Sequence, residues 1–218
     1  SGYTDYSQFT QGLINNINNG TILLNYAGHG STNLWTGEEL FNTGTVGLLN
    51  NYRKYPFVVS LTCLDGYFLN MEEEDESLAE VFLKRRDAGA IACFSPTGMG
   101  MPEGQRALSE ELFKSIFVDG NYRLGPATTK AKINFFSNTG GQYKDLIQTH
   151  TLFGDPALSL NIEKDIKVKK IGILPDNKQP SLSTSADGFA NILREVLTNV
   201  KDSERWKDGS KESKGPED

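Results

Sequence analysis

Two short stretches decide the fold that this sequence predicts: TILLNYAGHGS at residues 21–31 and PFVVSLTCLDGYF at residues 56–68. Each begins with an apolar run that is too short for a helix and ends in turn residues, as buried strands do. His29 follows the first run and Cys63 follows the second. If the two strands are parallel neighbours, their carboxyl ends lie side by side, where open α/β sheets place their active sites. The sequence therefore predicts that a thiol and an imidazole meet at one edge of a sheet.

The pattern around these stretches indicates an α/β domain. Residues 5–19 carry apolar side chains every three or four positions, which is typical of a helix with one buried face. Residues 77–87 repeat this pattern, and the apolar run 89–94 follows as a third buried strand. A strand, a helix and a strand at this spacing form a βαβ unit, so the sheet is expected to be mainly parallel. Further elements are expected as a short helix near 46–52, helices at 105–117 and 126–136, and a half-buried strand at 158–162.

The chain divides into three parts by composition. Residues 1–163 hold the predicted strands and helices of the α/β unit. Residues 164–186 are expected to form an edge strand and a Ser/Pro-rich linker. Residues 187–218 carry an amphipathic helix pattern and then a polar tail without a pattern, which is typical of disorder.

Composition narrows the classes of partner. The formal net charge is −6 over 218 residues and no cluster of Lys and Arg stands out, which argues against a nucleic-acid partner. No apolar stretch approaches the roughly 20 residues of a membrane-spanning helix, and no signal peptide is visible at the start of the chain. The two cysteines, Cys63 and Cys93, do not make a disulfide framework.

Cys63 and His29 together have the chemistry of acyl transfer. An ordinary cysteine thiol has a pKa of about 8.5, so an imidazole beside it can take the proton and stabilise the thiolate. Gly30 follows His29 and would let a substrate carbonyl approach its backbone N–H closely. The N–H groups of Gly30 and Cys63 are therefore candidate oxyanion donors for a reaction through a thioester.

Each of these residues also has a structural interpretation. A lone Cys at the end of an apolar run is most often a small buried hydrophobe, and a lone His in a Gly-flanked turn is usually structural. The pair argues more strongly for chemistry, because both residues end predicted parallel strands at the same edge. We expect Cys93 to be buried and inert and His150 to be structural.

The motifs in their order also resemble a known family. NYAGHGS with Trp35 downstream, FVVSLTCLDGYF, GAIACFSPTG and LFGDPAL are similar to segments of gingipain-family cysteine peptidases, within the group that includes caspases and legumain. The resemblance covers roughly residues 7–162. It implies a caspase-like fold, a catalytic dyad of His29 and Cys63, and an oxyanion hole lined by Gly30.

The chain also departs from that family. Gingipains have further sheet strands before the His strand, and acidic residues there orient the His and read a basic substrate side chain. We expect those strands to be missing here or supplied by an N-terminal chain or domain, so a preference for Arg or Lys is not carried over. The immunoglobulin-like module that follows in gingipains is not evident after Ile162. The resemblance implies an extracellular or cell-surface location.

Several further residues are candidates for binding. Trp35, Met99 and Met101 lie in loops at the same predicted sheet edge and could wall a substrate pocket, with core packing as the alternative. The acidic run at residues 72–76 could bind Ca²⁺, which family members bind, although it lacks the spacing of a calcium loop. No cofactor is expected to be required.

Three functions follow from these observations. The leading hypothesis is a cysteine endopeptidase in which Cys63 attacks a peptide carbonyl and His29 protonates the leaving amine. A second is a transpeptidase similar to the sortase of type IX secretion, in which an amine replaces water. A third is a scaffold or regulatory module whose dyad is idle.

Overall fold

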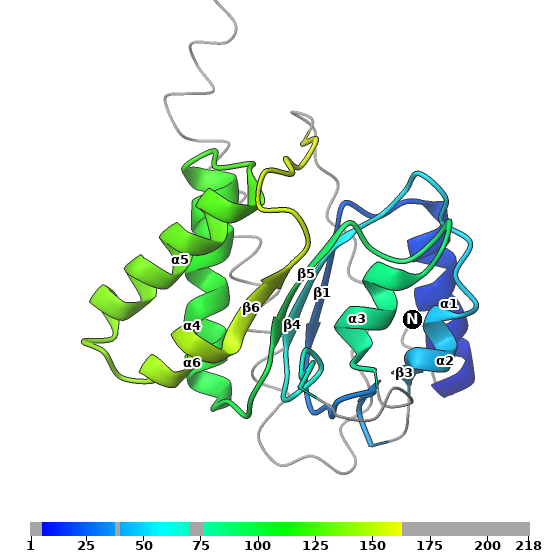
Figure 1. The fold of residues 1–218 in the computed structure, drawn as a ribbon, viewed down its shortest axis with the longest axis horizontal. Coiled ribbons are helices and arrows are strands. Elements are labelled where there is room, and N and C mark those ends of the chain that lie inside the picture. Colours follow the sequence, from blue (N-terminus) through cyan, green and yellow to red (C-terminus); the bar gives the residue numbers. More distant parts are fainter. Residues whose placement is uncertain (1–5, 38–39, 70–75, 163–218) are drawn as a thin grey trace, which may run out of the picture.

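The computed structural model describes residues 6–37, 40–69 and 76–162. Its main sheet has four strands in the order β1-β4-β5-β6 (Figure 1). The first three strands run parallel, and the fourth is antiparallel to β5. The predicted mainly parallel sheet is therefore confirmed. The strand bounds are β1 Leu23–Ala27, β4 Phe57–Leu61, β5 Ala92–Pro96 and β6 His150–Phe153.

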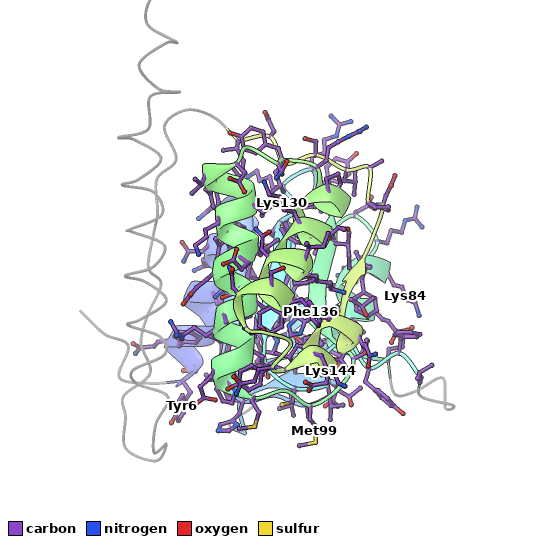
Figure 2. The ribbon with its side chains drawn as sticks, turned by 90° about the vertical axis from the view of Figure 1, so that its left-hand side faces the viewer. Tyr6, Lys84, Met99, Lys130, Phe136 and Lys144 are labelled. Atoms are coloured by element: carbon purple, nitrogen blue, oxygen red, sulfur yellow. The ribbon has the colours of Figure 1, made fainter. Side chains whose placement is uncertain are left out.

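Helices cover both faces of this sheet (Figure 1). The first three helices lie on one side and the last three on the other, and Figure 2 looks onto the second layer, with Lys130 and Phe136 on α5 and Lys144 on α6. A small ribbon of two antiparallel strands, β2 and β3, precedes α2. The bounds are α1 Tyr6–Asn19, β2 Leu34–Trp35, β3 Phe41–Asn42, α2 Thr43–Val46, α3 Leu78–Lys84, α4 Pro102–Phe113, the π-helical turn η1 Lys114–Val118, α5 Leu124–Asn138 and α6 Lys144–Thr149.

The central strand β4 explains why its sequence is a continuous apolar run. All five of its residues are buried. Val58 joins the core on the side of α1 and α3, whereas Phe57, Val59 and Leu61 join the core formed by α4, α5 and α6. A strand that buries both faces has no position for an exposed polar side chain, so alternation is lost.

Two local signals set the end of α1 and the start of α3. Gly20 stops α1 with a φ of 106°, a conformation that Gly adopts without steric cost. Ser77 caps α3 and forms a capping box with Glu80. Both ends were predicted to within one or two residues, although α3 ends at Lys84, before the predicted end at residue 87.

Two predicted elements are wrong. The short helix near 46–52 is instead α2, which begins earlier because Asn42 caps it by accepting from the Thr45 N–H. The strand expected at 158–162 does not join the sheet. Its backbone bonds to the segment that leads into α5, through Leu124 N–H to the Leu158 carbonyl and Leu160 N–H to the Tyr122 carbonyl. The strand beside β5 is β6, which the sequence analysis missed.

The remaining elements are close to their predicted positions. The strand predicted at 89–94 is β5 at Ala92–Pro96, and the helix predicted at 105–117 starts three residues earlier because Pro102 occupies its first turn. The edge strand, linker, helix and tail predicted within 164–218 lie outside the described residues. In the part of the chain that the structure describes, no helix is long and apolar enough to span a membrane.

Candidate active site

The register of β1 and β4 brings the two reactive residues to the same sheet edge. Ala27 pairs with Leu61 at the end of the parallel ladder, and the Gly28 N–H donates to the Leu61 carbonyl at 3.1 Å. His29 and Cys63 therefore follow two hydrogen-bonded strands at equivalent positions. We call residues 28–36 the His29 loop and residues 62–66 the Cys63 turn.

The backbone of the His29 loop is fixed while its imidazole is exposed. The His29 carbonyl accepts two hydrogen bonds, from the Tyr26 hydroxyl at 2.5 Å and from the Thr36 N–H at 2.8 Å. The Ser31 N–H donates to the Leu34 carbonyl at 3.0 Å, which closes the loop as a narrow antiparallel bridge. The imidazole itself makes no hydrogen bond to any described residue, Cys63 included, so no hydrogen bond within this part of the chain fixes its orientation.

Gly30 joins the His29 loop to the Cys63 turn. A Cβ atom on Gly30 would collide with Thr62 Oγ1 and lie 3.0 Å from the Leu34 carbonyl oxygen. Only a residue without a side chain fits this approach. The residue after the imidazole therefore packs directly against the residue before the thiol.

The Cys63 turn is tight and strained. Cys63 is partly buried, and its Sγ lies 3.9 Å from the carbonyl oxygen of Gly100 in the loop after β5. Leu64 has a left-handed backbone with φ of 64°, which costs about 1 kcal/mol for a residue with a side chain. Hydrogen bonds hold this conformation: the Leu64 N–H donates to the Gly98 carbonyl at 3.2 Å and the Gly66 N–H to the Pro96 carbonyl at 3.0 Å.

At this end of the sheet, two backbone N–H donors have no acceptor within the described part of the chain. Neither the Gly30 N–H nor the Cys63 N–H has an acceptor among residues 6–37, 40–69 and 76–162. A backbone N–H that lacks a partner beside a nucleophile is suited to hold a developing negative charge. The arrangement can therefore serve a thiol that attacks a carbonyl group.

Asp65 is a residue whose role sequence reasoning missed. Its side chain is 1% exposed, and its Oδ2 accepts a hydrogen bond from the Trp35 indole at 2.9 Å. Trp35 in turn stacks on Tyr26 at 4.5 Å between ring centroids, and Tyr26 holds the His29 carbonyl. Asp65 thus ties the Cys63 turn to the His29 loop from inside the core.

The buried position changes the acidity of Asp65. Burial raises the pKa of this carboxyl to about 6, because a charge is poorly solvated there, and the nearby hydroxyl and indole donors offset only part of that effect. The available signal in the sequence was its position, two residues after Cys63 and opposite the loop that carries Trp35.

The structure separates the three residues predicted to wall a substrate pocket. Trp35 is 2% exposed and packs among Tyr26, Phe41 and Phe82, so the core-packing alternative describes its position. Met99 and Met101 are 75% and 59% exposed and flank Gly100, whose carbonyl oxygen approaches the Cys63 thiol. Figure 2 shows Met99 projecting from the lower end of the molecule. Their contact with a substrate stays a prediction.

Cys93 and His150 are buried, as expected of structural residues. Burial raises the pKa of the Cys93 thiol well above its usual value, and its Sγ lies 3.9 Å from the Ala79 carbonyl oxygen. Burial also lowers the pKa of His150 to about 4, and its Nε2 lies 3.2 Å from the Ser60 carbonyl oxygen. Neither side chain is accessible to a substrate.

The predicted calcium site cannot be placed within the described residues, because positions 70–75 lie outside them. Glu76 is described and forms an ion pair with Lys84 at 2.5 Å. Among the residues that the structure covers, no group of three or more His, Cys, Asp or Glu side chains could hold a metal ion. Calcium binding by residues 72–76 stays a prediction.

Known proteins are similar to this chain in sequence and in fold. The sequence model of Peptidase family C25 matches residues 1–161. Gingipain R2 and gingipain R1 of Porphyromonas gingivalis are each 28% identical to this chain over 151 residues, or 67% of it. That match covers 20% of gingipain R2 and 15% of gingipain R1, so the chain spans a fifth or less of these relatives.

Two solved structures resemble the fold. The complex of RgpB pro- and mature domains from Porphyromonas gingivalis has a TM-score of 0.62 and 24% identity, with 69% of this chain and 37% of that chain covered. The Arg-specific cysteine proteinase gingipain R (RgpB) has a TM-score of 0.59 and 26% identity, with coverages of 69% and 36%. The α/β architecture is therefore shared with these structures.

Proposed function

Because this chain belongs to peptidase family C25, we propose that it cleaves peptide bonds as a cysteine peptidase, with Cys63 as nucleophile and His29 as acid and base. The resemblance to gingipains that the motifs predicted is confirmed by the family match and by the relatives. The observation that carries the proposal is the packing of Gly30 against Thr62, which joins the two reactive loops at one sheet edge.

The proposed reaction has two stages. His29 takes the proton of the Cys63 thiol as the Sγ bonds to the scissile carbonyl carbon, and the carbonyl oxygen becomes an oxyanion that accepts from the Gly30 and Cys63 N–H groups. The C–N bond then breaks as His29 gives a proton to the leaving amine, which leaves a thioester. Water attacks the thioester while His29 takes its proton. The C–S bond then breaks as His29 returns that proton to the Cys63 sulfur, which releases the acid product and the free thiol.

We propose that other parts of the protein complete this site. β1 is the outermost strand of the described sheet, and no described residue forms a hydrogen bond with the His29 imidazole. The relatives are several times longer than the matched segment, and one solved neighbour is a complex of pro- and mature domains. A segment before β1, or a separate chain, would pair with β1 and supply an acidic group to His29. An extracellular or cell-surface location is part of the proposal.

The substrate is proposed to be an extended peptide that passes Met99 and Met101. Both side chains are exposed and lie on either side of Gly100, at the end of the sheet where the Cys63 turn lies. Exposed methionines adapt their shape to different apolar partners. The Arg specificity stated for the solved gingipain R is not carried over to this chain.

The test compares the two cysteines in the complete protein. Cys63→Ala should abolish peptide hydrolysis, whereas Cys93→Ala, which removes the buried thiol, should leave kcat/KM within about two-fold of wild type. Retained hydrolysis in Cys63→Ala would contradict the proposal. Mass spectrometry of the products with an added amine separates hydrolysis from transpeptidation, because a transpeptidase would give mainly the amide rather than the acid.

A further inference from the structure

Gln105 is a buried polar residue that the reaction above does not use. It lies in the first turn of α4 and is 5% exposed. Its side-chain Nε2 donates to the backbone carbonyl oxygen of Thr62, the residue before Cys63. An amide group in such a buried position needs a partner, because an unsatisfied buried donor destabilises the fold. Here that partner is the peptide bond that leads into the proposed nucleophile.

The geometry of a peptide bond turns this contact into a constraint on Cys63. The Thr62 carbonyl and the Cys63 N–H belong to the same planar trans peptide unit, so they point in opposite directions. With the carbonyl held toward α4 by Gln105, the Cys63 N–H must point away from α4. That N–H has no acceptor among the described residues.

The surroundings leave Gln105 little freedom to move. A Cβ on Gly100 would lie 2.8 Å from Gln105 Nε2 and 2.7 Å from Leu146 Cδ2, so the loop after β5 closes tightly over this amide. The carbonyl of the same Gly100 lies beside the Cys63 thiol. Gln105 and Gly100 therefore pack together around Cys63. Gln105 fixes the Thr62–Cys63 peptide, and the Gly100 carbonyl approaches the Cys63 Sγ.

We propose that Gln105 is a positioning residue: it holds the Thr62–Cys63 peptide so that the Cys63 N–H faces the oxyanion of the reaction. The proposal rests on the peptidase function proposed above. It predicts a specific effect, because Gln105 acts on the oxyanion donor and not on the thiol itself.

Two reactions at the same sulfur separate these roles. Hydrolysis of a peptide and reversible addition of a peptide aldehyde both place negative charge on an oxygen, whereas alkylation by iodoacetamide displaces iodide from a saturated carbon and forms no oxyanion. In the complete protein, Gln105→Met should lower kcat/KM and weaken aldehyde inhibition by about 100-fold each, the usual cost of losing an oxyanion donor. The rate of Cys63 alkylation should stay within about two-fold of wild type.

A second variant and a matched control keep the result specific. Gln105→Glu has nearly the same shape, and its carboxylate cannot donate to the Thr62 carbonyl, whereas its protonated form can. Its kcat/KM, divided by its alkylation rate, should therefore rise relative to wild type as pH falls through the titration of the new carboxyl. Gln148→Met, at an exposed position of α6, should change none of these quantities.

Three outcomes would overturn the proposal. If folded Gln105→Met and Gln105→Glu hydrolyse peptides as well as wild type does, Gln105 does not position the donor. If alkylation falls in step with hydrolysis, Gln105 only supports the local structure. If wild type neither hydrolyses peptides nor binds the aldehyde, the peptidase function itself fails and this inference fails with it.

Discussion

The Cys63 turn is held by hydrogen bonds from three directions, whereas the hydrogen bonds of the His29 loop within the described residues fix its backbone and the Trp35 side chain but not the His29 imidazole. Gln105 bonds to the peptide before Cys63. The end of β5 and the loop after it accept from the Gly66 and Leu64 N–H groups, and the Ala79 N–H of α3 donates to the Asp65 carbonyl at 2.9 Å. On the other side, the His29 carbonyl is fixed but the imidazole has no hydrogen bond within the described chain.

This difference indicates how the proposed site is divided. The proposed nucleophile and oxyanion donors are held by strands, helices and loops that lie within residues 27–105. The proposed base is brought to the same end of the sheet, and we propose that a group outside the described residues orients it. Four changes test this division, from the largest expected effect to the smallest.

The contact of Gly30 with Thr62, which joins the His29 loop to the Cys63 turn, should be the most sensitive to substitution. Gly30→Ala would force a Cβ against Thr62 Oγ1 and the Leu34 carbonyl, and so push the His29 loop away from the Cys63 turn. We expect kcat/KM to fall by about 100-fold, because a displacement of about 1 Å at a reacting group has that effect. Gly37→Ala is the matched control, since a Cβ there meets nothing within 4 Å. Equal activity of the two variants would show that the contact does not set the reaction geometry.

The buried hydrogen bond between Trp35 and Asp65, which joins the His29 loop to the Cys63 turn, should contribute to stability. Trp35→Phe keeps an aromatic ring against Tyr26 but removes the N–H that Asp65 accepts. At pH 7.5, urea unfolding should show a loss of about 3 kcal/mol, because a buried carboxylate loses its donor. At pH 4.5 the carboxyl is protonated in the folded protein, and the loss should shrink to about 1 kcal/mol. The same loss at both pH values would contradict the assignment.

The charge of Asp65 should itself destabilise the fold at neutral pH. Burial raises its pKa from 3.8 to about 6, so the folded protein binds this proton more tightly than the unfolded chain does. The penalty is full above pH 6 and disappears as pH falls toward 4. Asp65→Asn should therefore raise the free energy of unfolding by about 2 kcal/mol at pH 7.5 and change it little at pH 4. Asp87→Asn, at an exposed site, should show no such pH-dependent gain.

The exposed methionines should give the smallest effect. Met99→Ala and Met101→Ala should raise KM for a peptide substrate by about two- to five-fold and leave kcat unchanged, because they lose only apolar contact with bound substrate. Unfolding should stay within about 0.5 kcal/mol of wild type, since both side chains are largely exposed. Leu48→Ala, another exposed apolar side chain, is the control and should leave KM unchanged.

Local pattern was sufficient for much of the fold. The runs before His29 and Cys63 are parallel neighbours, as predicted. The second run, β4, is continuously apolar because it is buried on both faces. The alternation of Leu158 and Leu160 misled the prediction: these side chains reach the core beside α5 rather than a sheet face. The true partner strand β6 contains His150 and Thr151 and has no apolar run to reveal it.

The candidate site could likewise be predicted only in part from the sequence. His29, Gly30 and Cys63 could be proposed because they follow the ends of two neighbouring parallel strands, and these ends lie side by side. Asp65 and Gln105, which hold these loops in place, could not be identified from the sequence. Asp and Gln are usually exposed, and no local pattern predicts that these two residues are buried. Their roles depend on contacts with Trp35 and Thr62 that only the tertiary structure creates.

The most direct test of the central claim is the reactivity of Cys63 toward a peptidyl acyloxymethyl ketone in the complete, folded protein. Modified sites are mapped by mass spectrometry in wild type, in His29→Ala and in urea-denatured wild type. We expect rapid modification of Cys63 with Cys93 unmodified in the folded wild type, and a rate at least about ten-fold lower in His29→Ala and in the denatured protein. A Cys63 that reacts no faster when folded, or as fast without His29, would contradict the dyad and favour a non-catalytic module.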